Sequence, residues 1–220
     1  MIAKLSLFGS PYIGVYIASN NFLAMVPGGT PADIKEKIKK VLKVEVFETL
    51  LGGSSLLGSL SVMNSYGAVI TDFAEDNDVN FLFERMNVLF VKDKINAVGN
   101  DILANDKAAL VHVDFDSKTV KMIEDVLDVE VVKGTIGGIK TVGSAAVVTN
   151  KGMLVHPETG ENEIDFLKNL FRVPVYLTTA NYGSKYLGAS IVANDNGAVV
   201  GERSSAVEID RVENGLDIIG

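Results

Sequence analysis

The two histidines of the chain lie close to carboxylates, and these are the first residues to consider for chemistry. His112 precedes Asp114 and Asp116, and His156 precedes Glu158. A metal site would need about three or four converging ligands. A histidine and a carboxylate without a nucleophile can serve at most as an acid–base pair. These groups therefore permit proton transfer and predict nothing more elaborate.

Two glycine pairs, Gly52-Gly53 and Gly137-Gly138, invite comparison with phosphate-binding loops. Neither pair continues into Lys-Ser or Lys-Thr, and the chain contains no G-x-G-x-x-G. The sequence also contains no cysteine, which excludes disulfides, thiolate metal ligands and a cysteine nucleophile. We therefore expect no catalytic residue, no metal and no cofactor, and we interpret the glycine pairs as turns.

Composition and charge narrow the class of partner. The 220 residues are 47% hydrophobic and carry a formal net charge of −8. No apolar run approaches the roughly 18 residues that a membrane span needs, and the first residues do not resemble a signal peptide. An acidic chain is poorly suited to phosphate contacts. We expect a cytoplasmic protein that binds little nucleic acid directly, binds no membrane and prefers a basic partner.

An internal repeat of about 44 residues must position these groups. Glycines 14, 58, 99, 143 and 188 each follow a small apolar pair, with successive spacings of 44, 41, 44 and 45, and each is predicted to begin a short strand. An asparagine follows at the predicted strand end, at positions 20, 64, 105, 150 and 194. A second apolar run follows it in every repeat, so each repeat is predicted to start with a β-hairpin. These second strands are predicted at residues 23–26, 67–70, 108–111, 152–155 and 197–200.

A helical pattern follows each hairpin. The clearest begins at Thr30, a good N-cap, with Pro31 in the first helical position and Ile34, Ile38, Val41 and Leu42 on one face. Ser117 is the predicted cap of the third helix. The fourth carries Ile164, Leu167, Leu170 and Phe171, while the second is expected over residues 79–86 and the fifth near residues 207–214.

A third strand is predicted after four of the helices, at residues 44–46, 88–90, 129–131 and 173–175. The fifth repeat ends without one, and residues 2–6 have the spacing of the missing strand. The N-terminus would then complete the last repeat and close a ring, which leaves no open end to the array. We predict an α/β protein with one domain over residues 1–220. Its repeats would span approximately 8–52, 53–93, 94–137, 138–182 and 183–220, the last completed by strand 1–7. A three-layer α/β domain with accidentally even spacing is the alternative.

The repeat changes the interpretation of the histidines. His112 and His156 occupy the same slot after the second strand, where Pro27 and Thr71 stand in the first two repeats. The glycine pairs also share a slot. Residues that recur at one slot favour a structural role at strand ends and turns over catalysis.

Five α/β units in a closed ring resemble the pentein fold, or α/β propeller. Beyond architecture, the amino-acid sequences of several segments resemble the translation initiation factor 6 family, the ribosome anti-association factors of archaea and eukaryotes. These segments begin at Leu51 (LGGSSLLGS), Ala97 (AVGND), Ala109 (ALVH), Val126 (VLDVEV), Thr141 (TVGS), Thr149 (TNKG) and Leu154 (LVHP). The resemblance runs from about residue 10 to residue 215. The absence of cysteine and of a long C-terminal extension resembles the archaeal members.

This resemblance implies a binding protein rather than an enzyme. Members of the family dock on the intersubunit face of the large ribosomal subunit, prevent premature association with the small subunit, and act in translation initiation and late large-subunit maturation. Their chief contact is a basic ribosomal protein of the L14 type near the sarcin–ricin loop. An acidic chain, expected here to be monomeric, suits such a partner.

The resemblance also implies which residues bind. We call the five repeated glycines the anchor glycines and the strands predicted to begin at them the anchor strands. The family's contact face lies at the starts of the anchor strands. In this chain these positions are Gly14, Gly58, Ser59, Gly99, Asn100, Ser144 and Ala145. Ser59 stands where eukaryotic members carry an arginine, so the resemblance does not imply a salt-bridging contact at this place. Alternatively, the glycines serve only the backbone geometry of the repeat.

Two other functions remain open at this point. Other pentein proteins are enzymes that process guanidino compounds through a cysteine nucleophile, and this chain has no cysteine for that covalent route. A bare repeat scaffold with an unrelated partner is the third possibility, because a fold alone does not determine function.

Overall fold

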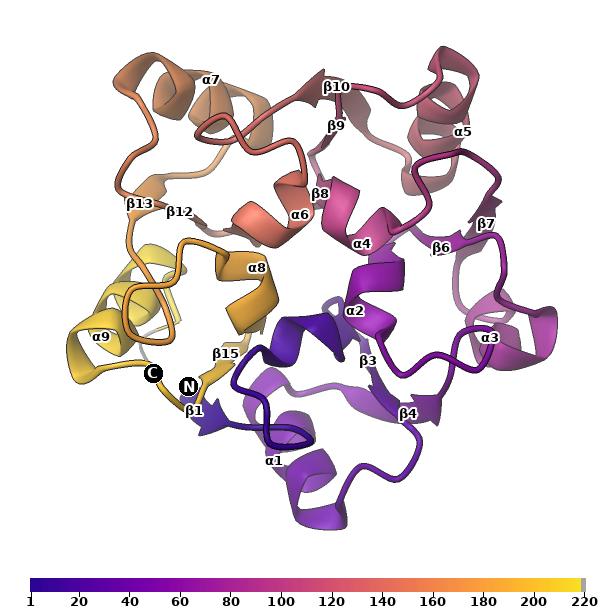
Figure 1. The fold of residues 1–220 in the computed structure, drawn as a ribbon, viewed down its shortest axis with the longest axis horizontal. Helices are drawn as coiled ribbons and strands as arrows, with labels where there is room; N and C mark the ends of the chain where they lie inside the picture. The colour runs from indigo at the N-terminus through magenta and orange to yellow at the C-terminus, as the bar shows by residue number, and fades with distance from the viewer. Residues whose placement is uncertain (219–220) are drawn as a thin grey trace.

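The protein is a ring of five similar units around a central axis, as the computed structural model, which describes residues 1–218, shows (Figure 1). Each unit of the described chain contains a three-stranded sheet with one antiparallel and one parallel pairing. The sheets are β2 (Ala18–Ser19), β3 (Leu23–Pro27) and β4 (Glu45–Thr49); β5 (Ser61–Met63), β6 (Gly67–Thr71) and β7 (Asn87–Val91); β8 (Ile102–Ala104), β9 (Ala108–His112) and β10 (Glu130–Gly134); β11 (Val147–Val148), β12 (Met153–Val155) and β13 (Val175–Leu177); and β14 (Ile191–Asn194), β15 (Gly197–Gly201) and β1 (Ile2–Leu5). The pentein-like ring predicted from the repeat is confirmed.

Two sets of helices accompany the sheets. One long helix per unit follows the second strand and lies at the periphery: α1 (Ala32–Leu42), α3 (Asp76–Phe83), α5 (Ser117–Leu127), α7 (Glu161–Phe171) and α9 (Ala206–Gly215). In the first four units it leads to the parallel third strand, whereas in the fifth unit that strand is the N-terminal β1. A parallel pair needs such a crossover, whereas an antiparallel pair needs only a turn. One short turn per unit lies near the axis: η1 (Ile13–Val15), α2 (Leu57–Leu60), α4 (Val98–Asp101), α6 (Val142–Ala145) and α8 (Leu187–Ser190).

The N-terminal strand closes the ring, as predicted. β1 pairs in parallel with β15, with Ile2 opposite Ala198 and Leu5 opposite Gly201. The amino group of Met1 donates a hydrogen bond of 2.8 Å to the carbonyl oxygen of Ile218. The two ends of the described chain therefore meet at one seam (Figure 1).

The hydrophobic core is divided among the boundaries between units. One cluster joins Leu23 and Met25 of the first unit to Ile70 and Leu82 of the second. Four comparable clusters lie at the other boundaries of the described chain. Because each sheet is buried against the next unit, a single unit could not bury its apolar residues alone.

The first segment of each repeat differs from the prediction. The five anchor glycines do not begin strands; they lie in the short turns η1, α2, α4, α6 and α8, and the inner strands begin several residues later. The apolar residues of these segments are buried in either conformation, so hydrophobicity did not distinguish a turn from a strand. The structure also corrects the strand end of the fourth repeat, where Thr149, not Asn150, accepts from the Lys151 and Gly152 amides, as the other strand-end asparagines do from the equivalent amides.

The helix starts differ in smaller ways. α1 begins at Ala32 with Pro31 as its N-cap, and the Thr30 hydroxyl donates to the Pro27 carbonyl instead. α5 is capped by Asp116, whose side chain accepts from the Lys118 amide at 2.7 Å, so Ser117 is the first helical residue. α3 begins at Asp76, three residues before the predicted start. Caps are local hydrogen-bonding choices, which sequence patterns resolve only to within a few residues.

Candidate functional site

The five short turns meet around the axis because they carry glycine. A Cβ built on Gly58 would overlap the carbonyl oxygen of Gly14, and the same holds for each anchor glycine against its equivalent in the preceding unit. The cycle closes, because Gly14 meets Gly188 in the same way. The backbone alone therefore fits at this end of the axis, which we call the glycine end.

A narrow channel follows the axis. Its section at the glycine end has a volume of about 120 Å³ and is bordered by all five anchor glycines. A second section of about 50 Å³ lies at the other end, and both share the lining residues Ser19, Met63, Ala104, Val148 and Ala193. Neither section approaches the roughly 300 Å³ that small-molecule pockets occupy. The axis therefore does not form an active-site cavity of ordinary size.

The other end of the axis, which we call the asparagine end, links successive units by side chains. The Asn20 amide nitrogen donates to the Asn64 carbonyl at 2.8 Å, while its Oδ1 accepts from the amides of Phe22 and Leu23. Asn64, Asn105 and Asn194 make the corresponding inter-unit bonds. These asparagines are buried and hydrogen-bonded across the boundaries, so they join units rather than bind ligands.

The binding residues predicted from the resemblance lie together at the glycine end, with unequal exposure. Gly14, Gly58, Gly99, Asn100 and Ser144 border the channel mouth and are partly exposed. Ser59 and Ala145 are buried, with 8% and 1% of their surfaces exposed. The turn itself directs these two residues inward.

Exposed apolar side chains surround the same end, and sequence reasoning missed them. Tyr12, Leu56 and Tyr186 stand immediately before the turns η1, α2 and α8, with 41%, 40% and 43% of their surfaces exposed. Phe8 and Tyr182, at the tips of nearby loops, are 55% and 84% exposed. Tyr12, Leu56 and Tyr186 share a position two residues before an anchor glycine, and this was the signal that could have found them.

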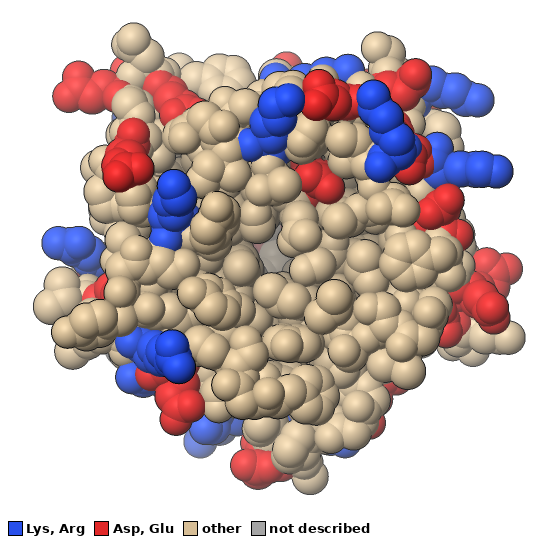
Figure 2. Space-filling view, in the orientation of Figure 1, with Lys and Arg blue, Asp and Glu red and all other residues tan. Residues whose placement is uncertain are grey.

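The charged residues of this face lie mainly away from the axis. Figure 2, drawn from the glycine end, shows lysine, arginine and acidic side chains mostly toward the rim, with an uncharged area around the axis and over the lower right. Solitary apolar residues are ordinary on a surface, but a cluster of them within an uncharged area is typical of a protein-binding face. The geometry at this end would suit docking to another protein.

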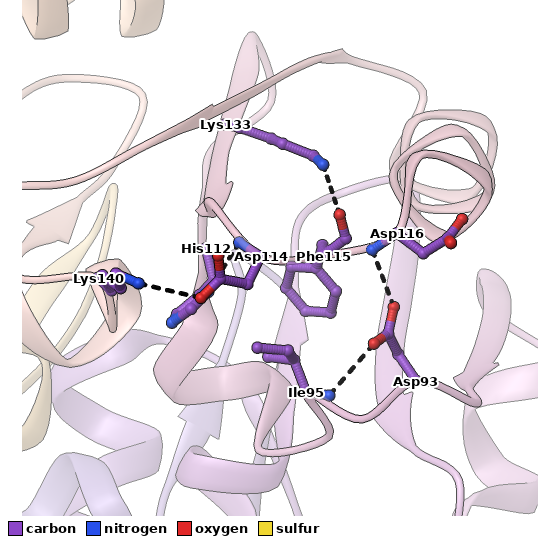
Figure 3. A network of polar contacts seen from close by, with 8 residues as sticks. All are labelled: Asp93, Ile95, His112, Asp114, Phe115, Asp116, Lys133 and Lys140. Atoms are coloured by element: carbon purple, nitrogen blue, oxygen red, sulfur yellow. Dashed lines mark hydrogen bonds and ion pairs between the residues drawn. The ribbon is translucent and has the colours of Figure 1, made fainter.

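The histidines act at strand ends, as the repeat predicted. The Nδ1 atom of His112 accepts a hydrogen bond from the Asp114 amide at 3.1 Å, and His156 accepts from the Glu158 amide at 3.2 Å. Lys140 Nζ lies 3.0 Å from an Asp114 carboxylate oxygen (Figure 3). This hydrogen bond is the main reason that the pKa of Asp114 lies below its ordinary value. Over residues 1–218, no three potential metal ligands converge.

A proton-transfer role would need a buried carboxylate near a histidine, and Asp101 is such a carboxylate close to His112. Burial in α4 raises its pKa, and the charge of His112 acts in the opposite direction. A raised pKa near a histidine is a feature of acid–base sites. The axial channel beside it, however, is too narrow to be an ordinary substrate pocket.

The glycine pairs form turns in which the amide of the first glycine is already engaged. Gly52, Gly53, Gly137 and Gly138 all have positive φ. The Gly52 amide donates to Asp78 at 2.7 Å, and the Gly137 amide donates to Glu163 at 3.0 Å. The carboxylate of the next long helix thus occupies the position that a phosphate would need. The turn interpretation is confirmed.

Comparisons with known proteins agree on one family. A sequence model of the eIF-6 family matches residues 2–215. Translation initiation factor 6 of Picrophilus torridus is 45% identical over 98% of this chain and 100% of its own length. The protein of the same name from Thermoplasma acidophilum is 44% identical over the same shares, and that of Pyrococcus horikoshii is 38% identical over 99% of each chain.

A comparison of folds finds a similar ring in DDAH, a protein with a different name and little sequence identity. DDAH from Pseudomonas aeruginosa, solved as a mutant in complex with citrulline, superimposes with a TM-score of 0.50 over 99% of this chain and 88% of its own, at 11% identity. At that identity the likeness concerns the pentein ring alone. No helix within residues 1–218 is long and apolar enough to cross a membrane. The match over nearly the whole length, with archaeal relatives at 38–45% identity, shows that the chain belongs to the eIF-6 family.

Proposed function

We propose that this protein acts in translation initiation by binding the large ribosomal subunit on its intersubunit face and preventing premature association with the small subunit. The relatives named translation initiation factor 6 support the role. The observation that carries the proposal is the glycine end, whose area around the axis is largely uncharged (Figure 2), together with the exposed Phe8, Tyr12, Leu56, Tyr182 and Tyr186. A ring that blocks subunit joining sterically needs a docking face and no catalytic group. The same docking would let it accompany late maturation of the large subunit.

The partner that fits best is a basic protein of the L14 type near the sarcin–ricin loop. The chain carries a net charge of −8, so its long-range field attracts basic protein and repels RNA phosphate. Aromatic side chains supply most of the energy at protein interfaces. Gly14, Gly58, Gly99, Asn100 and Ser144 would form the centre of the contact, with Ser59 and Ala145 supporting them from below. The protein would act as a cytoplasmic monomer.

Sedimentation of archaeal ribosomal subunits tests this proposal. We expect the protein to comigrate with large subunits and to reduce the formation of joined ribosomes. Tyr12→Arg combined with Tyr186→Arg should weaken binding at least about 10-fold, because both changes desolvate a charge in the contact. Asn100→Arg should act in the same direction. Tyr66→Arg, at a residue 45% exposed near the asparagine end, is the matched control and should bind normally.

The salt dependence of binding distinguishes the partner. Contacts to many RNA phosphates give a steep linear fall of log K with log salt, about 0.9 per phosphate for a duplex. Docking on protein should give a much shallower fall. Failure to comigrate, or equal loss in the Tyr66→Arg control, would contradict the docking face, and a steep slope would contradict the protein partner.

A further inference from the structure

A groove opens between the first and second units at the asparagine end, away from the proposed docking face. It has a volume of about 690 Å³ and is bordered by Phe22, Lys39, Lys43, Val44, Arg85 and Met86. Asn21 and Ser65 line both this groove and the asparagine end of the axial channel, which places the groove on that side of the ring. Its volume lies within the range of pockets that bind ligands.

The groove exists because the second unit has a short helix. α3 has eight residues, whereas α1, α5 and α7 have 11. Asn64, Asn105 and Asn194 each donate a hydrogen bond to the last carbonyl of the following unit's long helix, at Leu127, Phe171 and Leu42. Among residues 1–218, Asn20 finds only the Asn64 carbonyl, because α3 ends too early to reach it.

A difference in one side chain keeps the groove open. At the boundary between the third and fourth units, Lys107 extends across the junction and donates to the carbonyls of Asn150 and Arg172, both at 3.2 Å. Phe22 holds the equivalent position, two residues after the strand-end asparagine, and 61% of its surface is exposed. A phenyl ring cannot make these bonds, so it borders an open space instead.

Three cations border the groove in a chain that is acidic overall. Within residues 1–218, Lys39 and Lys43 make no ion pair or hydrogen bond through their side chains, and both residues are exposed. Arg85 is held in place: its Nη1 donates to the Phe81 carbonyl at 2.7 Å, and its guanidinium lies 4.9 Å from the centre of the Phe47 ring. Glu45, 3.5 Å from Arg85, offsets one of the three positive charges.

We propose that this groove binds an acidic peptide segment of a partner protein, with its carboxylates at Lys39 and Lys43 and an apolar side chain against Phe22 and Met86. Charge complementarity favours an anion, and the partly apolar walls favour an attached hydrophobic group. A polyphosphate backbone fits less well, because Glu45 lies in the groove and Arg85 already uses its guanidinium. Lys39 lies in the last turn of α1 and Lys43 is its C-cap, where the helix carbonyl dipoles also attract cations, so the test must separate the two effects.

Fluorescence anisotropy with a labelled hexapeptide of four glutamates, one phenylalanine and one leucine tests the groove. We expect saturable binding to the full chain at low salt. Lys39→Glu combined with Lys43→Glu should weaken binding about 10-fold or more, and Phe22→Ala about 5-fold. Lys37→Glu combined with Lys40→Glu changes the net charge equally, at positions of α1 outside the groove, and should have little effect. Tyr66→Ala is the matched control for Phe22→Ala.

Three results would overturn the proposal: no saturation with the peptide, equal loss in the two lysine pairs, or tighter binding of a single-stranded hexanucleotide than of the peptide. The groove is independent of the proposed docking face, so the two can fail separately. Ribosomal subunit binding should be unchanged in the Lys39→Glu, Lys43→Glu variant.

Discussion

Glycine is required at the five anchor positions for a reason that lies in the neighbouring unit. Each of these residues faces the backbone carbonyl of its equivalent, so no side chain fits between the two turns. The structural role predicted as the alternative for these glycines is therefore sufficient to explain them. It does not prevent a contact role, because Gly14, Gly58 and Gly99 remain partly exposed at the channel mouth.

Gly99→Ala should lower the free energy of unfolding by about 2 kcal/mol or more, since overpacking against backbone costs in the range of about 1–3 kcal/mol. The added Cβ would overlap the carbonyl oxygens of Gly58 and Ser61, neither of which can move without shifting a turn. Urea denaturation measures the change. Gly28→Ala is the matched control, because a Cβ there meets nothing within 4 Å. Equal stability of the two variants would show that the turns can separate at little cost.

At the scale of elements, a carboxylate clamp joins each of three loops to the start of a long helix. Asp78 of α3, Glu163 of α7 and Glu208 of α9 accept hydrogen bonds from the amides of Gly52, Gly137 and Gly183. The third unit reverses the arrangement. There the loop supplies the carboxylate of Asp93, which accepts from the Asp116 amide at the start of α5 (Figure 3). The same carboxylate also accepts from the Thr119 hydroxyl. Either arrangement satisfies the free amides at a helix N-terminus or in a tight turn.

Glu208→Gln should destabilise the protein at neutral pH by about 1–3 kcal/mol, the usual cost of weakening buried, charge-assisted hydrogen bonds. Glu208 accepts from the Thr179 hydroxyl at 2.7 Å and from the Ser205 amide at 2.7 Å. Burial acts to raise its pKa, but hydrogen bonds from Ser205, Thr179 and Gly183 together lower it. The exposed Glu202→Gln is the control.

The pH dependence has a defined sign. Because the folded pKa of Glu208 is depressed, its stabilising contribution is present above the unfolded pKa of about 4.3 and is lost as pH falls through the folded value. Thermal unfolding followed by circular dichroism between about pH 3 and pH 7 should show a smaller pH-dependent loss in Glu208→Gln than in the parent. Parallel curves would show that Glu208 does not contribute ionised hydrogen bonds.

At the scale of the whole molecule, we expect the stability of the ring to depend on its closure. β1 covers the edge of β15, and Leu5 is buried in the cluster that joins the fifth unit to the first. An unpaired strand edge exposes its amide and carbonyl groups and invites aggregation. The N-terminal strand thus has a role that the other third strands fulfil within a continuous unit.

Deleting residues 1–5 should lower the free energy of unfolding by about 3 kcal/mol or more, because it removes a buried strand and opens the edge of β15. A circular permutant tests the same idea by keeping the ring closed while moving the chain ends. Joining the native ends with a short linker and opening the chain between the exposed Gly28 and Gly29 should keep the melting temperature within about 5 °C of the parent. A truncated protein as stable as its parent would refute the role of closure.

Much of the fold was predictable because each repeat carries the same local pattern of hydrophobic residues. The second and third strands, the long helices and the closure by residues 2–5 all follow from spacing that recurs along the chain. The family was predictable as well, from segments such as the one beginning at Leu51. Five copies reinforce one another, so a weak signal at one helix, such as α3, is corrected by the others.

Only the tertiary structure decided how the five repeats contact one another. The anchor glycines lie in turns because five backbones converge on one axis, and no single repeat contains that information. Thr149 replaces the expected asparagine because its hydroxyl makes the same bonds to the Lys151 and Gly152 amides. The burial of Ser59, the exposure of Tyr12 and Tyr186, and the groove beside α3 likewise depend on contacts between units. Sequence thus determined the repeat and the ring, whereas packing between units determined which surfaces are available to bind.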